Sequence, residues 1–221
     1  MNSINLLIIE LILCYITQIF LYKYYKIKGL YIYTIVAMIL SCLMSLKVTT
    51  VYEYDMNLGI IPFVTIFISN NIIIQKQGPE ATKSLILTLI ATSLVSYAMI
   101  YLVKLMTPSS INLFTSASYD NIFNESLRMY FANIVTILYS LLLNSKLYYY
   151  LKKMKNNILV SNLFSSIIIQ FVSSILFGLI AYVFIKEPID IIKIIMIRYL
   201  MSLIVGIIGT IPIYLTKKVV E

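Results

Sequence analysis

The chain has 221 residues, of which 61% are hydrophobic and 12% are charged, and its net charge is +8. Its mean hydropathy is +0.94, whereas a soluble domain is roughly half apolar and about 25% charged. This composition excludes an ordinary soluble globule and predicts a single transmembrane helical domain over residues 1–221. The basic charges fall mostly outside the apolar runs, so they do not indicate a nucleic-acid partner.

Apolar runs long enough to cross a bilayer recur along the chain. A spanning helix needs about 20 such residues, and helices are the open-chain solution because lipid offers no partner for backbone polar groups. The predicted fold class is therefore an all-α integral membrane protein, a bundle of about six to seven transmembrane helices. The candidate spans are 5–22, 30–48, 58–74, 83–105, 128–150, 158–185 and 194–215.

Basic residues are divided unequally between the two sets of loops. The positive-inside rule places the richer set in the cytoplasm, so we expect the N-terminus outside, the C-terminus in the cytoplasm, and a multi-pass protein of the plasma membrane. We assign Arg128 and Arg198 to the outer set, which also contains the longest connection, Thr107–Leu127. The richer set holds 11 of the 17 Lys and Arg: Lys23, Lys26, Lys28, Lys76, Lys83, Lys146, Lys152, Lys153, Lys155, Lys217 and Lys218.

Polar side chains recur at helical spacing inside three spans. Residues i, i+4 and i+7 share one helix face. The amides on these faces either line a polar solute site or join helices by interhelical hydrogen bonds; an unpaired carboxamide in hydrocarbon would cost several kcal/mol. The residues concerned are Asn71 and Gln75; Asn133 and Asn144; and Asn162, Ser166, Gln170 and Ser173.

Groups for catalysis or metal binding are scarce. The chain has no His, and Glu10 is the one acid within a predicted span, near an end where its side chain is expected to reach the membrane surface. The two cysteines, Cys14 and Cys42, lie inside apolar runs. Paired carboxylates or an activated nucleophile are what an enzyme would need. We therefore expect no enzyme and no cofactor, but a protein that moves a small molecule.

Two stretches, KGLYIYTIVAMILSCLMSLKV and LGIIPFVTIFISNNIIIQKQGPEA, resemble the queuosine-precursor transporter family, also called the vitamin uptake transporter (VUT) family. The similarity continues through the segments YDNIFNESLRMYFANIVTILYSLLLNSKLYYYLKK, NLFSSIIIQFVSSILF and IRYLMSLIVGIIGTIPIYL. It covers about 200 residues of the chain. The residues in register are Lys47, Leu58, Gly59, Gly78, Glu80, Ala81, Phe123, Arg128, Ala132, Asn162, Ser165, Gln170, Tyr199, Thr210 and Tyr214.

The chain departs from the family pattern at its buried charges. Family acids fall on Asn71, Gln75, Asn144, Ser173 and Gly209, and a family Lys falls on Ser202. The resemblance implies an importer of deazaguanine-type precursors of queuosine. Because amides suit a neutral ring edge with mixed donors and acceptors, we expect altered specificity for a neutral, flat, nucleobase-like heterocycle, or loss of transport with the fold retained.

The alternative is a non-transporting membrane subunit, a substrate-capture, immunity or accessory component that works with a separate energising complex. The sequence leaves open whether the chain pairs with a second copy or with an energising partner. Arg128 enters the candidate site through the resemblance, and Tyr199 is either a stacking partner for the solute or an interfacial anchor. The predicted substrate-binding residues are Asn71, Gln75, Arg128, Asn133, Asn144, Asn162, Ser166, Gln170, Ser173 and Tyr199.

Overall fold

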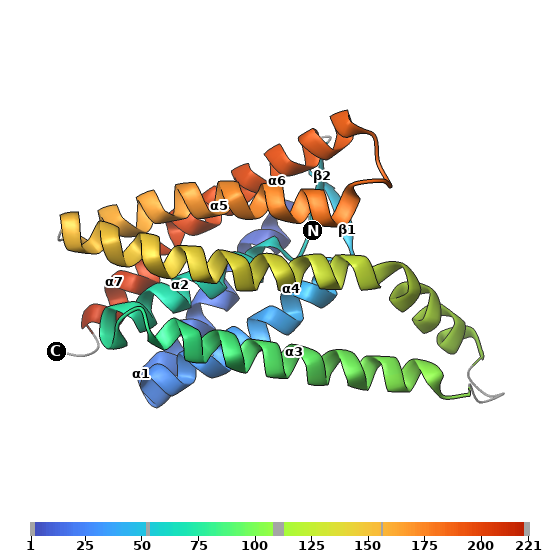
Figure 1. The fold of residues 1–221 in the computed structure, drawn as a ribbon, viewed down its shortest axis with the longest axis horizontal. Coiled ribbons are helices and arrows are strands. Elements are labelled where there is room, and N and C mark those ends of the chain that lie inside the picture. Colours follow the sequence, from blue (N-terminus) through green and yellow to red (C-terminus); the bar gives the residue numbers. More distant parts are fainter. Residues whose placement is uncertain (1–2, 52–53, 108–112, 156, 219–221) are drawn as a thin grey trace.

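Helices account for most of the chain in the computed structural model, which describes residues 3–51, 54–107, 113–155 and 157–218 (Figure 1). This agrees with the predicted all-helical class. The elements are α1 (Ser3–Met44), β1 (Val48–Val51), β2 (Tyr54–Asn57), α2 (Ile60–Gln77), α3 (Ala81–Leu105), α4 (Leu113–Lys155), α5 (Ile158–Tyr182), α6 (Pro188–Ile208) and α7 (Thr210–Lys218).

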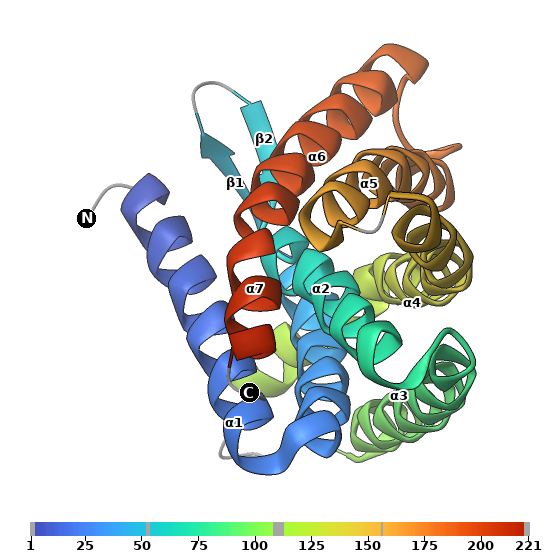
Figure 2. The same ribbon diagram turned by 90° about the vertical axis from the view of Figure 1, so that its left-hand side faces the viewer.

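The first helix is folded back on itself at Lys26, whose backbone has φ 52° and ψ −133°. Its two arms lie side by side (Figure 2). Gly29 permits this turn, because a Cβ there would overlap the carbonyl oxygen of Leu21 in the first arm. The two arms correspond to the predicted spans 5–22 and 30–48.

The connection between α1 and α2 is an antiparallel β-hairpin, in which Val48 pairs with Asn57 and Val51 with Tyr54. Hydropathy predicted a helix as far as residue 48, so the hairpin is a correction to a purely helical description. The Asn57 side chain then accepts a hydrogen bond from the Gly59 amide at 2.9 Å, directly before α2 begins.

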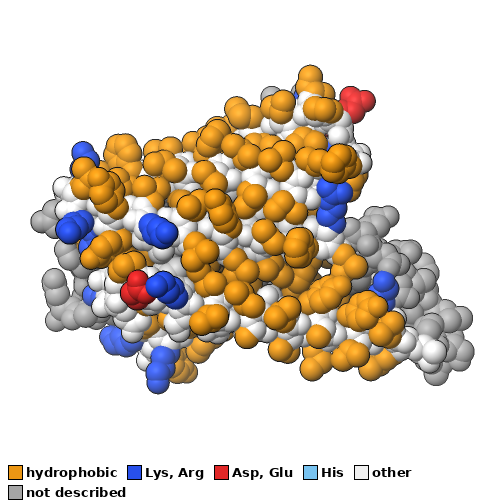
Figure 3. Space-filling model, viewed as in Figure 1, with side chains coloured by type: hydrophobic (Ala, Val, Ile, Leu, Met, Phe, Trp, Pro, Cys, Tyr) orange, Lys and Arg blue, Asp and Glu red, His pale blue; other side chains and the backbone are white. Residues whose placement is uncertain are grey.

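The turns of the molecule collect at two ends. One end, here called the basic end, holds the bend of α1, the turn between α2 and α3, and the C-terminus (Figure 1). Most of the Lys and Arg side chains visible in Figure 3 gather there, and apolar side chains cover the surface between the ends. The opposite end carries the β-hairpin and is called the hairpin end. Charged ends with an apolar girdle are what a membrane-spanning bundle requires.

Helix α2 lies at the centre of the bundle: every residue from Ile60 to Ile74 is buried. Within the described residues, five helical segments are long and apolar enough to cross a membrane: Ile4–Met44, Ala81–Leu105, Leu127–Lys155, Ile158–Tyr182 and Pro188–Thr216. Helix α2 is not one of them, although it matches the predicted span 58–74. Its buried surface contacts protein on all sides, so lipid does not have to accept its polar residues.

Two further boundaries differ from expectation. Helix α4 begins at Leu113, so much of the connection predicted over Thr107–Leu127 is helical, and residues 108–112 lie outside the described part. The last predicted span, 194–215, is divided at Gly209 into α6 and α7. A Cβ at Gly209 would overlap the side chain of Ile68, so the glycine lets this break approach α2 closely.

Candidate functional site

Four helices contribute to a continuous row of side-chain hydrogen bonds in the interior. Asn144 Nδ2 of α4 donates to Asn71 Oδ1 of α2 at 2.7 Å, and Asn71 Nδ2 donates to Asn162 Oδ1 of α5 at 2.8 Å. Asn162 Nδ2 then donates to Thr210 Oγ1 of α7 at 3.2 Å. Asn71, Asn144 and Asn162 are each no more than 1% exposed. We call these four residues the amide chain.

Local sequence explains how these side chains are positioned. The α5 helix starts where the Asn157 side chain caps the amides of Leu159 and Val160 at 2.9 and 3.3 Å, a role for which Asn is well suited. Asn162 follows within the second turn. Thr210 opens α7 directly after the break at Gly209, and the break turns its hydroxyl towards α5.

Gln75 extends the polar contacts of α2 by one turn towards the basic end. Its Nε2 donates to the hydroxyl of Tyr148 of α4 at 2.6 Å. Tyr148 is fully buried. The predicted pair Asn71 and Gln75 therefore meets α4 through two consecutive hydrogen bonds, one to Asn144 and one to Tyr148.

Asn133 lies on the same face of α4 but closer to the hairpin end. Its Nδ2 donates to Ser45 Oγ at 2.6 Å, where α1 ends. Asn133 Oδ1 is buried without a hydrogen-bond partner in the protein. A Cβ at Gly59 would overlap the Ser41 carbonyl and the Ser45 hydroxyl, so glycine at this position allows α2 to begin against α1 beside Asn133.

The polar face predicted for α5 is buried as a whole. Gln170 and Ser173 are at most 1% exposed, and Ser166 is 7% exposed. Ser173 Oγ donates to the Gln170 carbonyl oxygen at 3.1 Å, which is a local helix bond. Tyr199 of α6 is half-buried, and its ring lies edge-on to Phe171 with centroids 5.4 Å apart; the structure does not bring it to the amide chain.

Arg128 also lies apart from the other predicted residues. Its Nε donates to the Ile180 carbonyl oxygen at 2.8 Å, and its Nη2 donates to that of Val183. These carbonyls belong to the end of α5, where a helix leaves acceptors unpaired and favours a cation. In this structure Arg128 caps α5.

Sequence reasoning missed Arg198, which it assigned to the charges outside the spans. The residue instead lies within α6 and is 3% exposed. Its guanidinium carbon is 4.6 Å from the ring centroid of Phe63 of α2 and 3.7 Å from that of Phe177 of α5. Nη1 and Nη2 have no hydrogen-bond partner in the protein. The signal was available, because Arg198 falls inside the predicted span 194–215.

Further buried polar atoms on α4 and α5 have no hydrogen-bond partner within the described part of the chain. They are the hydroxyls of Thr136, Ser140 and Ser174. On α4 the first two lie between Asn133 and Asn144. The polar interior thus contains a paired set, the amide chain, and unpaired groups, which include these three hydroxyls and also Asn70 Nδ2 beside the amide chain.

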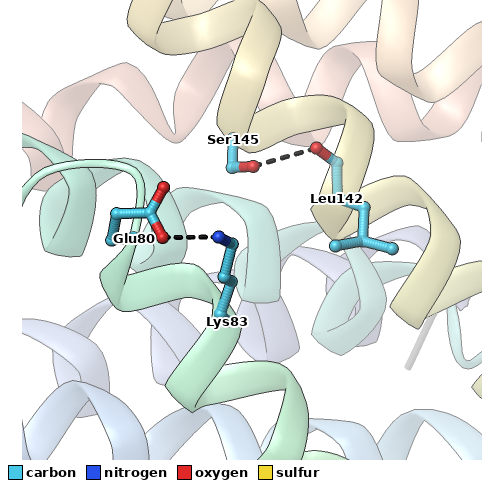
Figure 4. A network of polar contacts seen from close by, with 4 residues as sticks. All are labelled: Glu80, Lys83, Leu142 and Ser145. Atoms are coloured by element: carbon cyan, nitrogen blue, oxygen red, sulfur yellow. Dashed lines mark hydrogen bonds and ion pairs between the residues drawn. The ribbon is translucent and has the colours of Figure 1, made fainter.

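A separate cavity of about 790 Å³ opens at the basic end between α3, α4 and α5. Figure 4 shows its rim, where Lys83 pairs with Glu80 at 2.6 Å across from the α4 turn at Leu142 and Ser145. None of the predicted site residues lines this cavity. The Lys83–Glu80 pair at its rim is exposed, whereas the predicted site residues Asn71, Asn144 and Asn162 lie in the polar interior.

The arrangement offers hydrogen-bond donors and acceptors to a solute, together with one buried cation. Among the described residues, no group of three or more His, Cys, Asp and Glu is placed to hold a metal ion. Groups of this kind are chemically suited to hydrogen-bonding with a polar molecule.

Apolar side chains face outward over a girdle between two charged ends, and polar side chains meet between the helices. These features define a multi-pass membrane protein. The family model described as “Putative vitamin uptake transporter” matches residues 57–216, the greater part of the chain. The chain belongs to this vitamin uptake transporter family, which confirms the family expected from the sequence. No curated protein and no solved structure matches this chain.

Proposed function

We propose that this protein imports a small, flat heterocyclic solute of the queuosine-precursor type across the plasma membrane. The observation that carries the proposal is the amide chain, which joins α2, α4, α5 and α7 through three side-chain bonds. Each carboxamide offers both donors and an acceptor, so a ring edge with mixed donors and acceptors can exchange places with a neighbouring amide.

The position of the amide chain supports a specific role in the transport cycle. Asn71 and Asn162 lie towards the basic end, while the unpartnered Thr136, Ser140 and Ser174 lie on the other side of them. In this proposal the solute binds among the unpartnered groups with one edge against the amide chain, and the amide chain opens to release it. Gln170 and Ser173 of α5 border the solute, between those two regions.

Uptake of radiolabelled queuine by cells that lack their own transporter tests this function. We expect saturable uptake that weakens in Gln170→Ala. The matched control is Gln77→Ala, which removes an exposed carboxamide from the end of α2 and leaves uptake unchanged. Protein that is folded in the membrane and binds queuine without transporting it would instead indicate a substrate-capture subunit.

Restoring the acids of the family pattern tests whether the solute contacts α2. A carboxylate only accepts hydrogen bonds, so Asn71→Asp cannot donate to Asn162, and Gln75→Glu cannot donate to Tyr148. We expect this double variant to shift preference from neutral bases towards bases that carry an amino or amidine cation. Unchanged preference in a folded double variant would place Asn71 and Gln75 outside the solute site.

A further inference from the structure

Arg198 has no structural partner that accounts for its charge. A guanidinium presents five N–H donors in a planar fork, and in this protein both terminal nitrogens are buried and unpaired. Among the described residues, Glu10 is the one acid inside a predicted span, and it lines a different cavity with Cys14 and Pro62. In the described part of the chain, Arg198 forms no salt bridge with a carboxylate, and the titratable side chain that interacts with it is that of Tyr182.

The aromatic rings around Arg198 hold it in place without using its donors. Phe63 and Phe177 lie within 4.6 and 3.7 Å of the guanidinium carbon, and arginine stacks on such faces while its in-plane N–H groups stay available. Cation–π attraction, even in a desolvated site, is weaker than the cost of burying a cation. The arrangement thus orients the cation but leaves its desolvation largely uncompensated.

A second unpaired polar atom occurs on α4, one residue beyond a side chain that packs with Phe177. Phe177 packs against Ala132 of α4, the residue before Asn133, whose Oδ1 is also unpaired. Along α2, Phe63 and Asn71 are about 12 Å apart at about 1.5 Å per residue. Phe63, which contacts Arg198, and Asn71 of the amide chain therefore lie about two turns apart on the same helix.

We propose that Arg198 anchors the solute by donating to its carbonyl oxygen, with Phe63 and Phe177 fixing the plane of the guanidinium. This assignment rests on the proposed function and specifies which edge of the solute enters the site. A carbonyl group provides the acceptor that both free nitrogens lack, whereas an amino group at the same place would oppose donor to donor.

The test compares two bases that differ at one edge: 7-deazaguanine and 2,6-diamino-7-deazapurine, in which an amino group replaces the carbonyl. Each base competes with radiolabelled queuine for uptake by the wild-type protein and by Arg198→Met. We expect the wild type to prefer 7-deazaguanine and Arg198→Met to lose that preference at least about tenfold, as expected for a hydrogen bond from a charged donor. Equal discrimination by the two proteins would overturn the assignment.

Stability separates an anchoring role from a structural one. If Arg198 serves the solute, Arg198→Met leaves the solute-free protein at least as stable as the wild type, because a buried unpaired charge has been removed. If Arg198 holds the fold, the same variant unfolds more easily than the wild type, as we expect of Arg128→Met, and the proposal fails. Arg198→Lys provides a second folded variant, which keeps the charge, lacks the planar fork and is expected to lose discrimination as well.

Failure of the proposed function gives a different result. If the wild type takes up no queuine, the importer proposal fails, and the two bases are then compared by thermal shift on the purified protein. Stabilisation of the wild type by 7-deazaguanine that is lost in Arg198→Met would still support the anchor. Absence of any difference between the two bases would overturn it.

Discussion

Asn71 and Arg198 occupy the same polar interior but differ in how their hydrogen-bonding groups are used. Towards the basic end, Asn71 donates to Asn162 and accepts from Asn144. Towards the hairpin end, Arg198 directs no terminal nitrogen at a protein acceptor, and Asn133 Oδ1 is unpaired as well. A paired region stabilises the helix arrangement, whereas an unpaired one is maintained at a cost that a bound molecule can offset.

The largest expected effect concerns the paired region. Asn71→Ala leaves Asn144 Nδ2 and Asn162 Oδ1 buried without partners, so we expect the free energy of unfolding to fall by about 2–5 kcal/mol. Reversible unfolding in mixed detergent micelles measures it. The control is Gln77→Ala on the same helix, whose exposed side chain should change stability by less than about 0.5 kcal/mol. Equal effects of the two variants would show that the amide chain does not stabilise the bundle.

The two arginines sharpen the comparison. Arg128→Met removes two charge-assisted bonds to the carbonyls of Ile180 and Val183, and we expect it to lower the unfolding free energy by about 2–3 kcal/mol. Arg198→Met is expected not to lower the unfolding free energy. The same micelle unfolding measurement applies to both variants. A reversed order would mean that the pairing seen around the two guanidinium groups does not determine their contributions.

The smallest effect concerns single hydroxyl groups. Thr136→Val replaces an unpartnered hydroxyl by a methyl group and should change stability by less than about 0.5 kcal/mol. Thr65→Val is the matched case of a paired hydroxyl, because Thr65 Oγ1 accepts a hydrogen bond from Tyr33 at 2.8 Å. We expect this variant to lose about 1 kcal/mol of stability. Equal changes of unfolding free energy in the two variants would show that paired and unpaired hydroxyls do not differ in their contribution to stability.

Hydropathy and helical spacing predicted much of this arrangement from the sequence. The two arms of α1 and helices α2, α3 and α5 match predicted spans, because long apolar runs have few other solutions in lipid. The burial of Asn71, Asn144, Asn162 and Gln170 follows from their place on polar helix faces. Spacing alone could not show that three of these amides bond to one another, since that depends on how the helices are rotated and staggered.

Hydropathy did not predict the β-hairpin or the burial of Arg198. The hairpin was missed because hydropathy extends the second span to residue 48, although Val48–Val51 and Tyr54–Asn57 show the short runs around a two-residue turn that are typical of hairpins. Arg198 was grouped with the loop cations on the basis of charge alone. Its burial comes from Phe63 and Phe177, residues far away in the sequence that only the tertiary fold brings to it.

The central position of α2 has a consequence for biogenesis. With Asn70, Asn71, Gln75, Lys76 and Gln77 in its second half, this helix falls outside the segments apolar enough to cross a membrane alone. A translocon that sorts segments by hydropathy would therefore release it into lipid poorly. Tyr33 of α1 hydrogen-bonds to Thr65 of α2, and Gln18 of α1 to Ser69. The arms of α1 are synthesised before α2, so they can supply polar partners to α2 while it inserts. Membrane insertion of this protein is then cooperative, because the two arms of α1 insert first and α2 inserts by packing against them.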